Sequence, residues 1–452
     1  MTLRPRYRSR IGAWAAAVAA LAASAPCPAG GGVDVTIPLV EQTLGFLRVS
    51  ALDPPPDHVL LRAGALRVCG PDLSSPGCLR PGSSPPRPGL SGPEANRVWR
   101  EVIESALAAE ALSQGSTFDR TAFQRYVMDA MVEALGDPAS FYVLPAIYRK
   151  IAAIPSSFVG FGVRVVPAGD VLVTTVVHPG SPAAAAGVTR GTRIVGVNGK
   201  GVTGYLRPAA LAAIWGADGD LLRLKIEHGP GTREIELTYR PWSFTPFVAQ
   251  RRGRILAVEV HSFGGGLAER VRRELNGPCD PAGIVLDLRD ASGGDEEEMI
   301  ALADLLLGGG PLGSREMREA LGSRTWVTAD GTAGERADLP AAVVIGPGTS
   351  GLAEVLAAAL RTPTRAILVG GRTAGLDTLE TLRPFSDGSA IQVTSTRLRG
   401  PGGASLSAGV LPHLETGRSG VVDLAVHVLE DVRGDASLET LLDAARRAVP
   451  AP

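Results

Sequence analysis

The segment from Ala341 to Leu376 constrains the fold of this chain more than any other. It contains two short apolar runs, 341–345 and 365–369, with a helix-like run, 351–360, between them. A tight turn follows each apolar run, so the order predicts strand, turn, helix, strand and turn. In such a unit the first turn lies at the N-terminus of the helix. Backbone N–H groups and the helix dipole favour developing negative charge there.

The residues of this segment resemble the core of the C-terminal processing peptidases, also called tail-specific proteases. In that family a run similar to Ser-Ala-Ser-Ala-Ser-Glu supplies the nucleophilic serine, and a later Thr-x-Gly-Lys supplies a lysine as general base. Here the two runs read Thr-Ser-Gly-Leu-Ala-Glu, ending at Glu354, and Thr-Ala-Gly-Leu, ending at Leu376. The resemblance therefore implies that Gly351 stands at the nucleophile position and Leu376 at the base position.

The positions of the lysines show whether another residue could supply the base. The chain contains only Lys150, Lys200 and Lys225, so no lysine follows residue 225. Arginine does not replace lysine as a base, because it stays protonated in proteins. A serine peptidase needs a nucleophile and a base within hydrogen-bond reach. The sequence thus predicts the scaffold of a serine peptidase without an intact Ser/Lys dyad.

A substitute nucleophile is the alternative to an inactive site. Ser350 precedes the expected nucleophile position by one residue, and a pair of Ser350 with His261 or His413 is chemically sensible. Ser350 can equally be a helix N-cap, for which serine is a preferred residue. The two histidines can equally be surface or hydrogen-bonded side chains.

Composition argues against several other classes of protein. The chain has 452 residues, enough for two or three domains, 20% charged residues and a net charge of -1. No Lys/Arg-rich patch stands out, so no nucleic-acid partner is expected. No metal-ligand cluster and no phosphate-binding glycine loop stands out either. We therefore expect no metal and no cofactor.

The N-terminus has the pattern of an export signal. Arginines at positions 4, 6, 8 and 10 precede the apolar run 13–23, and small residues follow at 22–25. The pattern predicts a signal peptide at 1–24 and a periplasmic or cell-envelope protein. The apolar run is too short to favour a spanning helix. An uncleaved membrane anchor at the N-terminus and a lipid on Cys27 are the alternatives.

The four cysteines are expected to meet an oxidising environment in an exported protein. Cys69 and Cys78 bracket a loop rich in proline, glycine and serine, which makes them the favoured disulfide pair. The sequence does not say whether Cys27 and Cys279 meet.

Two expected regions precede the peptidase-like core. Residues 25–97 are expected to form an N-terminal extension and a Pro/Gly-rich linker, with no recognisable motif over 33–67. Residues 98–155 carry apolar side chains at helical spacing and predict a helical segment. The stretch at 136–142 is similar to the Asp-Pro-x-Ser-x-Tyr stretch that precedes the PDZ domain in the peptidase family.

Residues 156–242 resemble the PDZ domains of exported proteases. The resemblance rests on Gly-Phe-Gly-Val at 160–163, Gly-Ser-Pro at 180–182 and Ile-Val-Gly-Val-Asn-Gly at 194–199. It implies that the amides of Phe161, Gly162 and Val163 face a terminal carboxylate and that a strand edge accepts an extended peptide. The alternative is a small β-domain whose groove is filled by the protein itself.

Residues 243–450 are expected to form the α/β core, similar to the ClpP and crotonase folds. A buried strand at 283–289 runs into Asp-Ala-Ser-Gly-Gly at 290–294, which resembles the family's Leu-Asp-Leu-Arg-x-Asn-Pro-Gly-Gly. The resemblance implies that the amides of Gly293 or Gly294 and of Leu352 build an oxyanion hole. The alternative is a tight turn that needs glycine.

Together these features predict an α+β multidomain protein that is a catalytically degenerate member of the family. It is expected to bind the C-terminal peptides of exported or membrane proteins, and an active protease relative is a further expected partner. One alternative is an active serine endopeptidase that uses a nucleophile such as Ser350. The other is a structural or assembly subunit that does not bind peptides.

Overall fold

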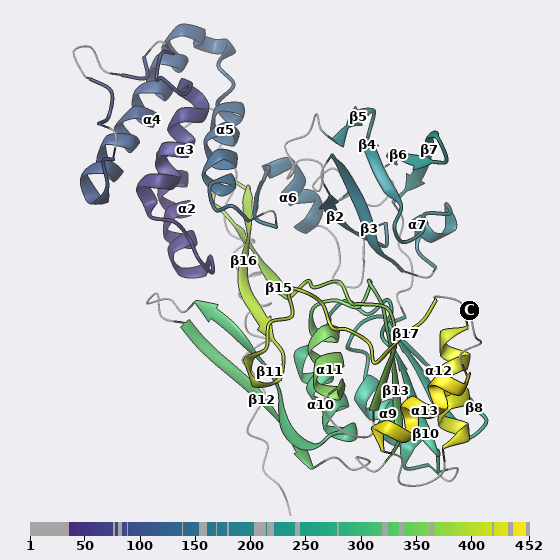
Figure 1. Cartoon of the computed structure of the whole chain (residues 1–452). Helices are drawn as coiled ribbons and strands as arrows, with labels where there is room; N and C mark the ends of the chain where they lie inside the picture. The colour runs from purple at the N-terminus through teal and green to yellow at the C-terminus, as the bar shows by residue number, and fades with distance from the viewer. Residues whose placement is uncertain are drawn as a thin grey trace, which may run out of the picture.

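The structure is a computed structural model, and its elements form three regions (Figure 1). A helical region lies nearest the N-terminus, a small β-region follows it, and an α/β region forms the rest of the chain. The structure describes residues 36–448 apart from gaps at 76, 80–83, 88, 138, 153–160, 169, 179, 203–213, 215–220, 240–244, 278–279, 319–323, 334–338, 362–365, 418–419 and 433–436.

The helical region contains four helices that share one hydrophobic cluster: α2 (Thr36–Ser50), α3 (Asp57–Cys69), α4 (Gly92–Gln114) and α5 (Arg120–Glu133). This corrects the expected division, because α2 and α3 belong to the stretch expected to be an extension, and the boundary at residue 98 falls inside α4. Val40, Thr43, Leu44 and Leu47 recur at helical spacing and are all buried, so the local sequence of α2 has a helical pattern.

A disulfide fixes the end of α3 to the following loop. Cys69 and Cys78 are bonded with an S–S distance of 2.01 Å, and both residues are buried in the cluster formed by the four helices. Cys27 and Cys279 lie outside the described residues.

An antiparallel sheet joins the helical region to the C-terminal half of the chain. Strand β1 (Phe141–Val143) pairs antiparallel with β16 (Ala390–Arg399), which also pairs with two further strands. Ile391 and Val393 of β16 lie in the helical cluster. The helical segment is therefore not an independent domain. The other strands of this sheet are β11 (Gly308–Arg318), β12 (Arg324–Ala333) and β15 (Thr378–Pro384).

The β-region is a sheet in the order β2-β3-β4-β6-β7, with a short strand paired to β4. One face of its strands carries the buried side chains Leu222, Leu224 and Ile226, and the alternating residues are exposed. Its elements are β2 (Val163–Ala168), β3 (Val171–Val177), α7 (Pro182–Ala185), β4 (Arg193–Val197), β5 (Lys200–Gly201), β6 (Leu221–His228) and β7 (Gly231–Thr238); helix α6 (Pro145–Ala152) precedes it.

The α/β region is built on a second sheet in the order β17-β14-β13-β10-β9-β8, parallel except for the edge strand β8. The strands are β8 (Phe247–Arg252), β9 (Ile255–Val260), β10 (Gly283–Asp287), β13 (Ala341–Ile345), β14 (Ala366–Gly370) and β17 (Leu414–Glu415). The helices are α9 (Leu267–Leu275), α10 (Glu296–Leu306), α11 (Leu352–Arg361), α12 (Val421–Asp431) and α13 (Leu438–Ala448).

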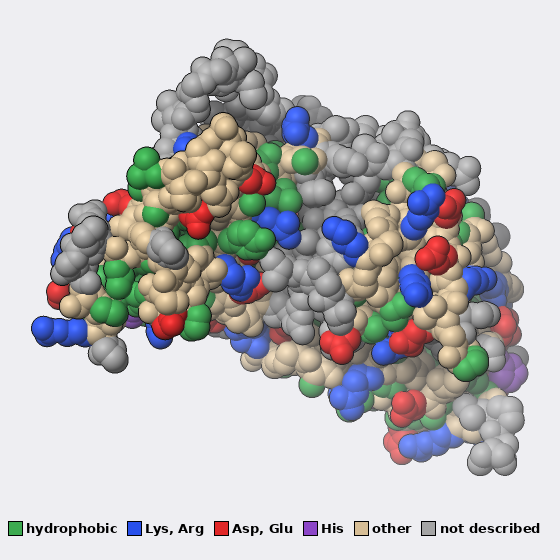
Figure 2. Space-filling view, turned by 90° about the horizontal axis from the view of Figure 1, so that it is seen from above, with side chains coloured by type: hydrophobic (Ala, Val, Ile, Leu, Met, Phe, Trp, Pro, Cys, Tyr) green, Lys and Arg blue, Asp and Glu red, His purple; other side chains and the backbone are tan. Residues whose placement is uncertain are grey.

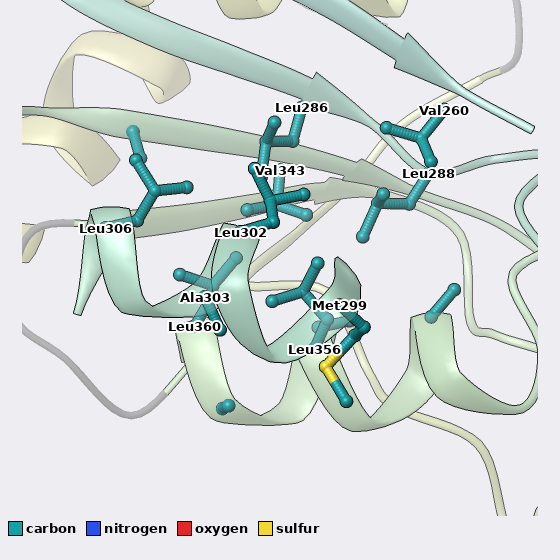
Figure 3. Packing of buried hydrophobic residues seen from close by; sticks show 14 of the residues in the cluster. Val260, Leu286, Leu288, Met299, Leu302, Ala303, Leu306, Val343, Leu356 and Leu360 are labelled. Atoms are coloured by element: carbon teal, nitrogen blue, oxygen red, sulfur yellow. The ribbon is translucent and has the colours of Figure 1, made fainter. Parts of the chain in front are cut away.

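Helices cover both faces of this sheet, as its sequence requires. Strands β10, β13 and β14 are buried at every position, which is typical of a parallel sheet between two helical layers. On one face Leu286 and Val343 pack toward Leu302 and Leu356 of α10 and α11 (Figure 3). On the other face the alternate strand residues pack against α12 and α13. The mixed α/β architecture and the predicted strand–helix–strand order of 341–370 are confirmed.

The surface gives no sign of a single dominant charge. On the face seen in Figure 2, basic and acidic side chains alternate over the described residues without a continuous patch of one sign. Within the described ranges, no helix is both long and apolar enough to cross a bilayer. The predicted signal peptide lies before the first described residue.

We predict that Asp129 makes stability depend on pH. Burial raises the pKa of this α5 carboxyl to about 6, against the opposing effect of Arg125. Since the folded-state pKa exceeds the unfolded one, the contribution is present below about pH 4 and is lost as the pH rises through about 6. Asp129→Asn should remove a pH-dependent term of about 3 kcal/mol between those limits. Denaturant unfolding at several pH values measures it, with exposed Asp443→Asn as control.

Candidate functional site

The candidate site lies at the carboxyl end of β13, where the chain turns into α11. The hydroxyl of Thr349 donates to the Leu288 carbonyl, with an oxygen-to-oxygen distance of 2.7 Å, and accepts from the Gly346 amide at 3.0 Å. The amide of Ser350 donates to the Ala291 carbonyl at 3.0 Å. Both Thr349 and Ser350 are buried. The turn is therefore fixed to the chain that leaves the neighbouring strand β10.

The structure places Gly351 and Leu376 in direct backbone contact. The Gly351 amide donates to the Leu376 carbonyl at 2.9 Å. Gly351 has φ +61°, a left-handed conformation that glycine adopts without strain. The nearest atom to a Cβ at this position would be the Leu376 oxygen at 4.0 Å, so space exists for a side chain. Neither residue carries a group that can act as nucleophile or base.

One buried carboxylate holds these two segments together. Glu354, on the first turn of α11, is completely buried. One of its oxygens accepts from the Gly351 amide at 3.2 Å. The other accepts from the Thr373 hydroxyl and from the Gly375 amide, the latter at 2.6 Å. Burial raises the pKa of Glu354, and these donors oppose the increase because they favour the ionised form.

The glycine loop after β10 packs against the same turn. Gly293 accepts hydrogen bonds through its carbonyl from the Phe263 amide at 2.8 Å and from the Ser262 hydroxyl at 3.1 Å. A Cβ at Gly294 would lie 2.2 Å from the Phe263 carbonyl oxygen, so only glycine fits there. This close approach explains why residue 294 is a glycine, and the explanation does not require an oxyanion hole. The oxyanion-hole role of Gly293, Gly294 and Leu352 remains a prediction.

The residues of the alternative Ser350–histidine pair lie in separate parts of the chain and have defined environments. Ser350 is 1% exposed. The ring nitrogens of His261 face the Thr245 carbonyl and the Glu259 carboxylate. Nδ1 of His413 accepts from the Leu368 amide at 3.0 Å. The pairing of Ser350 with either histidine remains a prediction.

Arg190 reaches the site from the β-region and was not expected from the sequence. Its Nη1 donates to the Arg289 carbonyl at 3.0 Å and lies 3.2 Å from an oxygen of Asp290. The same nitrogen would lie 2.0 Å from a Cβ placed on Gly348, so this guanidinium packs directly on the turn before Gly351. The partners are about a hundred residues apart in sequence, and no local pattern could have indicated the contact.

The predicted carboxylate-binding residues lie at the start of β2. The Phe161 ring is buried and packs edge-to-face on Tyr239, with ring centroids 5.3 Å apart. Gly162 has φ +76°, and its carbonyl accepts from the His178 amide at 2.8 Å. Phe161 therefore contributes a core side chain, and only its backbone is available for a ligand. The role of Phe161, Gly162 and Val163 remains a prediction, and Gly160 lies outside the described residues.

No arrangement suited to a metal ion is found among the described residues. No three histidine, cysteine or acidic side chains of that part of the chain come together as a metal site.

Known proteins resemble this chain in sequence and in fold. Residues 254–416 match the model of peptidase family S41. The chain is 28% identical over 283 residues to the carboxy-terminal processing protease CtpA of Bacillus subtilis (strain 168), covering 58% of this chain and 57% of that protein. It is 23% identical over 290 residues to a probable CtpA-like serine protease of Staphylococcus aureus (strain COL), covering 63% of this chain and 58% of that protein.

Solved structures agree on the fold. The photosystem II D1 C-terminal processing protease superposes with a TM-score of 0.54 at 24% identity, covering 70% of this chain and 88% of that one. This likeness concerns the fold alone. The chain spans less than two thirds of the length of the two bacterial relatives.

We predict that Glu354→Gln destabilises the protein by about 2–4 kcal/mol. The amide replaces one acceptor oxygen by an NH₂ group, which then faces N–H and O–H donors at a completely buried position. Denaturant unfolding compares this variant with Glu269→Gln, whose side chain is 61% exposed and should change stability by less than about 0.5 kcal/mol. Equal stability of the two variants would contradict the role given to Glu354.

Proposed function

Because the chain belongs to the C-terminal processing peptidase family, we propose that it is a degenerate member that binds peptide C-termini and does not cleave them. The observation that carries this proposal is the pair Gly351 and Leu376. By the resemblance these residues stand at the catalytic positions of the family. The Gly351 amide nitrogen lies 2.9 Å from the Leu376 carbonyl oxygen, and neither residue has a reactive side chain. With no lysine after residue 225, the α/β region also has no other source for the family's base.

The proposal separates binding from chemistry. Peptide capture by strand addition needs a backbone edge, free amides and an apolar pocket, none of which requires a serine or a lysine. Acyl transfer needs the lost side chains themselves. The family-like order of motifs across the β-region supports a PDZ-type domain at 156–242. The export pattern at 1–24 supports ligands among exported or membrane proteins of the periplasm or cell envelope.

The active-peptidase alternative requires a base beside Ser350, because an adjacent base activates a serine. The ring nitrogens of His261 contact Thr245 and Glu259, and Nδ1 of His413 accepts from the Leu368 amide, which favours the degenerate reading. The assembly-subunit alternative predicts no saturable peptide binding, and the binding experiment below therefore distinguishes it.

We predict that the protein lacking residues 1–24 does not cleave an unstructured substrate with an apolar C-terminus, and that Gly351→Ser/Leu376→Lys does. The two positions are in contact, and a side chain at 351 has space. Mass spectrometry of the substrate over a long incubation measures both. The left-handed φ at 351 costs a serine about 1–3 kcal/mol, so thermal unfolding must first show that the variant is folded.

The matched control is Gly351→Ala/Leu376→Lys, which carries the same backbone strain and the same lysine but no hydroxyl. It should stay inactive. Cleavage by the unmodified protein that is lost in Ser350→Ala would overturn the proposal and identify Ser350 as the nucleophile.

We predict that a peptide with an apolar C-terminal residue binds and that its C-terminal amide binds on the order of tenfold more weakly, since recognition requires the carboxylate. Gly162→Ala should also weaken binding, because it distorts the loop that presents the amides. Gly187→Ala is the control: both glycines have φ +76°, so the strain is similar, but Gly187 is exposed beyond α7. Isothermal titration calorimetry measures the binding of the peptide and of its amide to the unmodified protein, and of the peptide to each variant. No saturable binding of the peptide would favour the assembly-subunit alternative.

A further inference from the structure

His261 is a buried histidine that the proposed function does not use. It follows β9 directly and is 4% exposed. Its Nδ1 lies 2.8 Å from the Thr245 carbonyl oxygen, and its Nε2 lies 2.9 Å from an oxygen of Glu259. Both ring nitrogens therefore face acceptors.

This arrangement requires a proton that a neutral histidine does not have. A carbonyl oxygen only accepts, so Nδ1 must carry a hydrogen. A neutral ring would then present the Nε2 lone pair to the Glu259 carboxylate, which also only accepts. The contact is favourable only when Nε2 is protonated, which gives an imidazolium–carboxylate pair with a charge-assisted hydrogen bond.

The surrounding charges agree with this assignment. Burial opposes protonation of His261, but the hydrogen bonds to Glu259 and Thr245 and the charges of Glu259 and Asp290 outweigh it, and its pKa is raised. The hydrogen bond from His261 lowers the pKa of Glu259, and the charges of His261, Arg289 and Arg252 act in the same direction, against burial.

Charged groups from several elements surround the pair. Arg289 follows β10 and is itself paired with Asp287, while Arg252 belongs to the neighbouring strand β8 and is paired with Asp423 of α12. Asp290 faces Arg190 of the β-region.

Solvent can exchange protons with the pair. Glu259 is half-exposed and lines a cavity of about 250 Å³ together with Arg252, Asp287 and Arg289. The start of α12 forms another wall of this cavity. The buried ring of His261 thus lies one carboxylate away from bulk water.

The backbone around His261 connects two segments that matter for the candidate site. The amides of His261 and Ser262 both donate to the Pro246 carbonyl, at 2.8 and 3.0 Å. On the other side the His261 carbonyl accepts from the Ser292 amide at 3.3 Å. Ser292 belongs to the glycine loop, whose Ala291 in turn accepts from Ser350. Thr245 and Pro246 lead from the β-region into β8.

We propose that the His261–Glu259 pair is a proton-dependent positioning device that fixes the segment 245–246 and the glycine loop 290–294 against each other. With the proton present, the ring bridges Thr245 and Glu259. When the proton leaves Nε2 through Glu259 to solvent, the bridge loses one of its two hydrogen bonds, and the loop beside Ser350 is held less firmly. This inference does not depend on whether the site binds or cleaves peptides.

The sign of the pH effect follows from the linkage between protonation and folding. A histidine whose folded-state pKa lies above its unfolded value of about 6.5 stabilises the fold fully below that value. The contribution is lost as the pH rises through the folded-state pKa. Protection of the loop should therefore be high at mildly acidic pH and lower at alkaline pH.

Two measurements on the protein lacking residues 1–24 test the proposal. The first is an NMR titration of histidines labelled with carbon-13, where His261 is identified among the six histidines by the signal missing from His261→Gln. We expect a pKa above 6.5 that falls by at least one unit in Glu259→Gln. The second is hydrogen exchange of peptides covering 244–263 and 288–296 at pH 6 and pH 9, corrected for intrinsic exchange. We expect at least a tenfold loss of protection at pH 9.

The variants separate the proposal from general pH effects. Glu259→Gln should remove the pH dependence of protection, and so should His261→Gln where it folds. His427→Gln should behave like the unmodified protein, because His427 is 60% exposed on α12. The proposal is overturned if His261 titrates like a free histidine, if Glu259→Gln leaves its pKa unchanged, or if loop protection does not change through the titration.

Discussion

The carboxylate of Glu354 is the interaction on which the centre of this molecule depends. It is completely buried, and its oxygens accept hydrogen bonds from Gly351, Thr373 and Gly375, which belong to the two segments that resemble the catalytic runs of the family. A buried charge is tolerated only when its hydrogen-bonding capacity is satisfied. Glu354 therefore fixes the positions of Gly351 and Gly375. In turn, the backbone at both glycines must keep its conformation so that the carboxylate keeps its hydrogen bonds.

The three regions are connected through shared structure as well as through loops. Strand β16 lies in one sheet with β1 from the helical region, and its side chains enter the helical core. Arg190 of the β-region packs on the turn before Gly351 and contacts Arg289 and Asp290 there. The candidate site therefore lies where the β-region contacts the α/β region.

Charge is organised differently at the two sides of the glycine loop. On one side Glu354 is stabilised by neutral donors, which do not titrate in the physiological range. On the other side His261, Glu259, Arg289, Asp287, Asp290 and Arg190 form an extended network of ionic and hydrogen-bonding groups. The first arrangement gives permanent geometry, because its donors are backbone amides and a hydroxyl. The second can respond to a proton, since a histidine shares its hydrogen bond with a half-exposed carboxylate.

The sequence by itself determined the features that depend on neighbouring residues. Continuous apolar runs predicted β10, β13 and β14, glycine-rich turns predicted where they end, and motif order indicated the family and the substituted positions Gly351 and Leu376. Only the tertiary structure decided which distant groups meet: the donors around Glu354, the contact of Arg190 with Gly348, and the two acceptors around His261. It also decided that α2 to α5 are one unit joined to β16. Local patterns report burial and backbone conformation, whereas these contacts join residues far apart in the chain, and their energy exists only once the chain has folded.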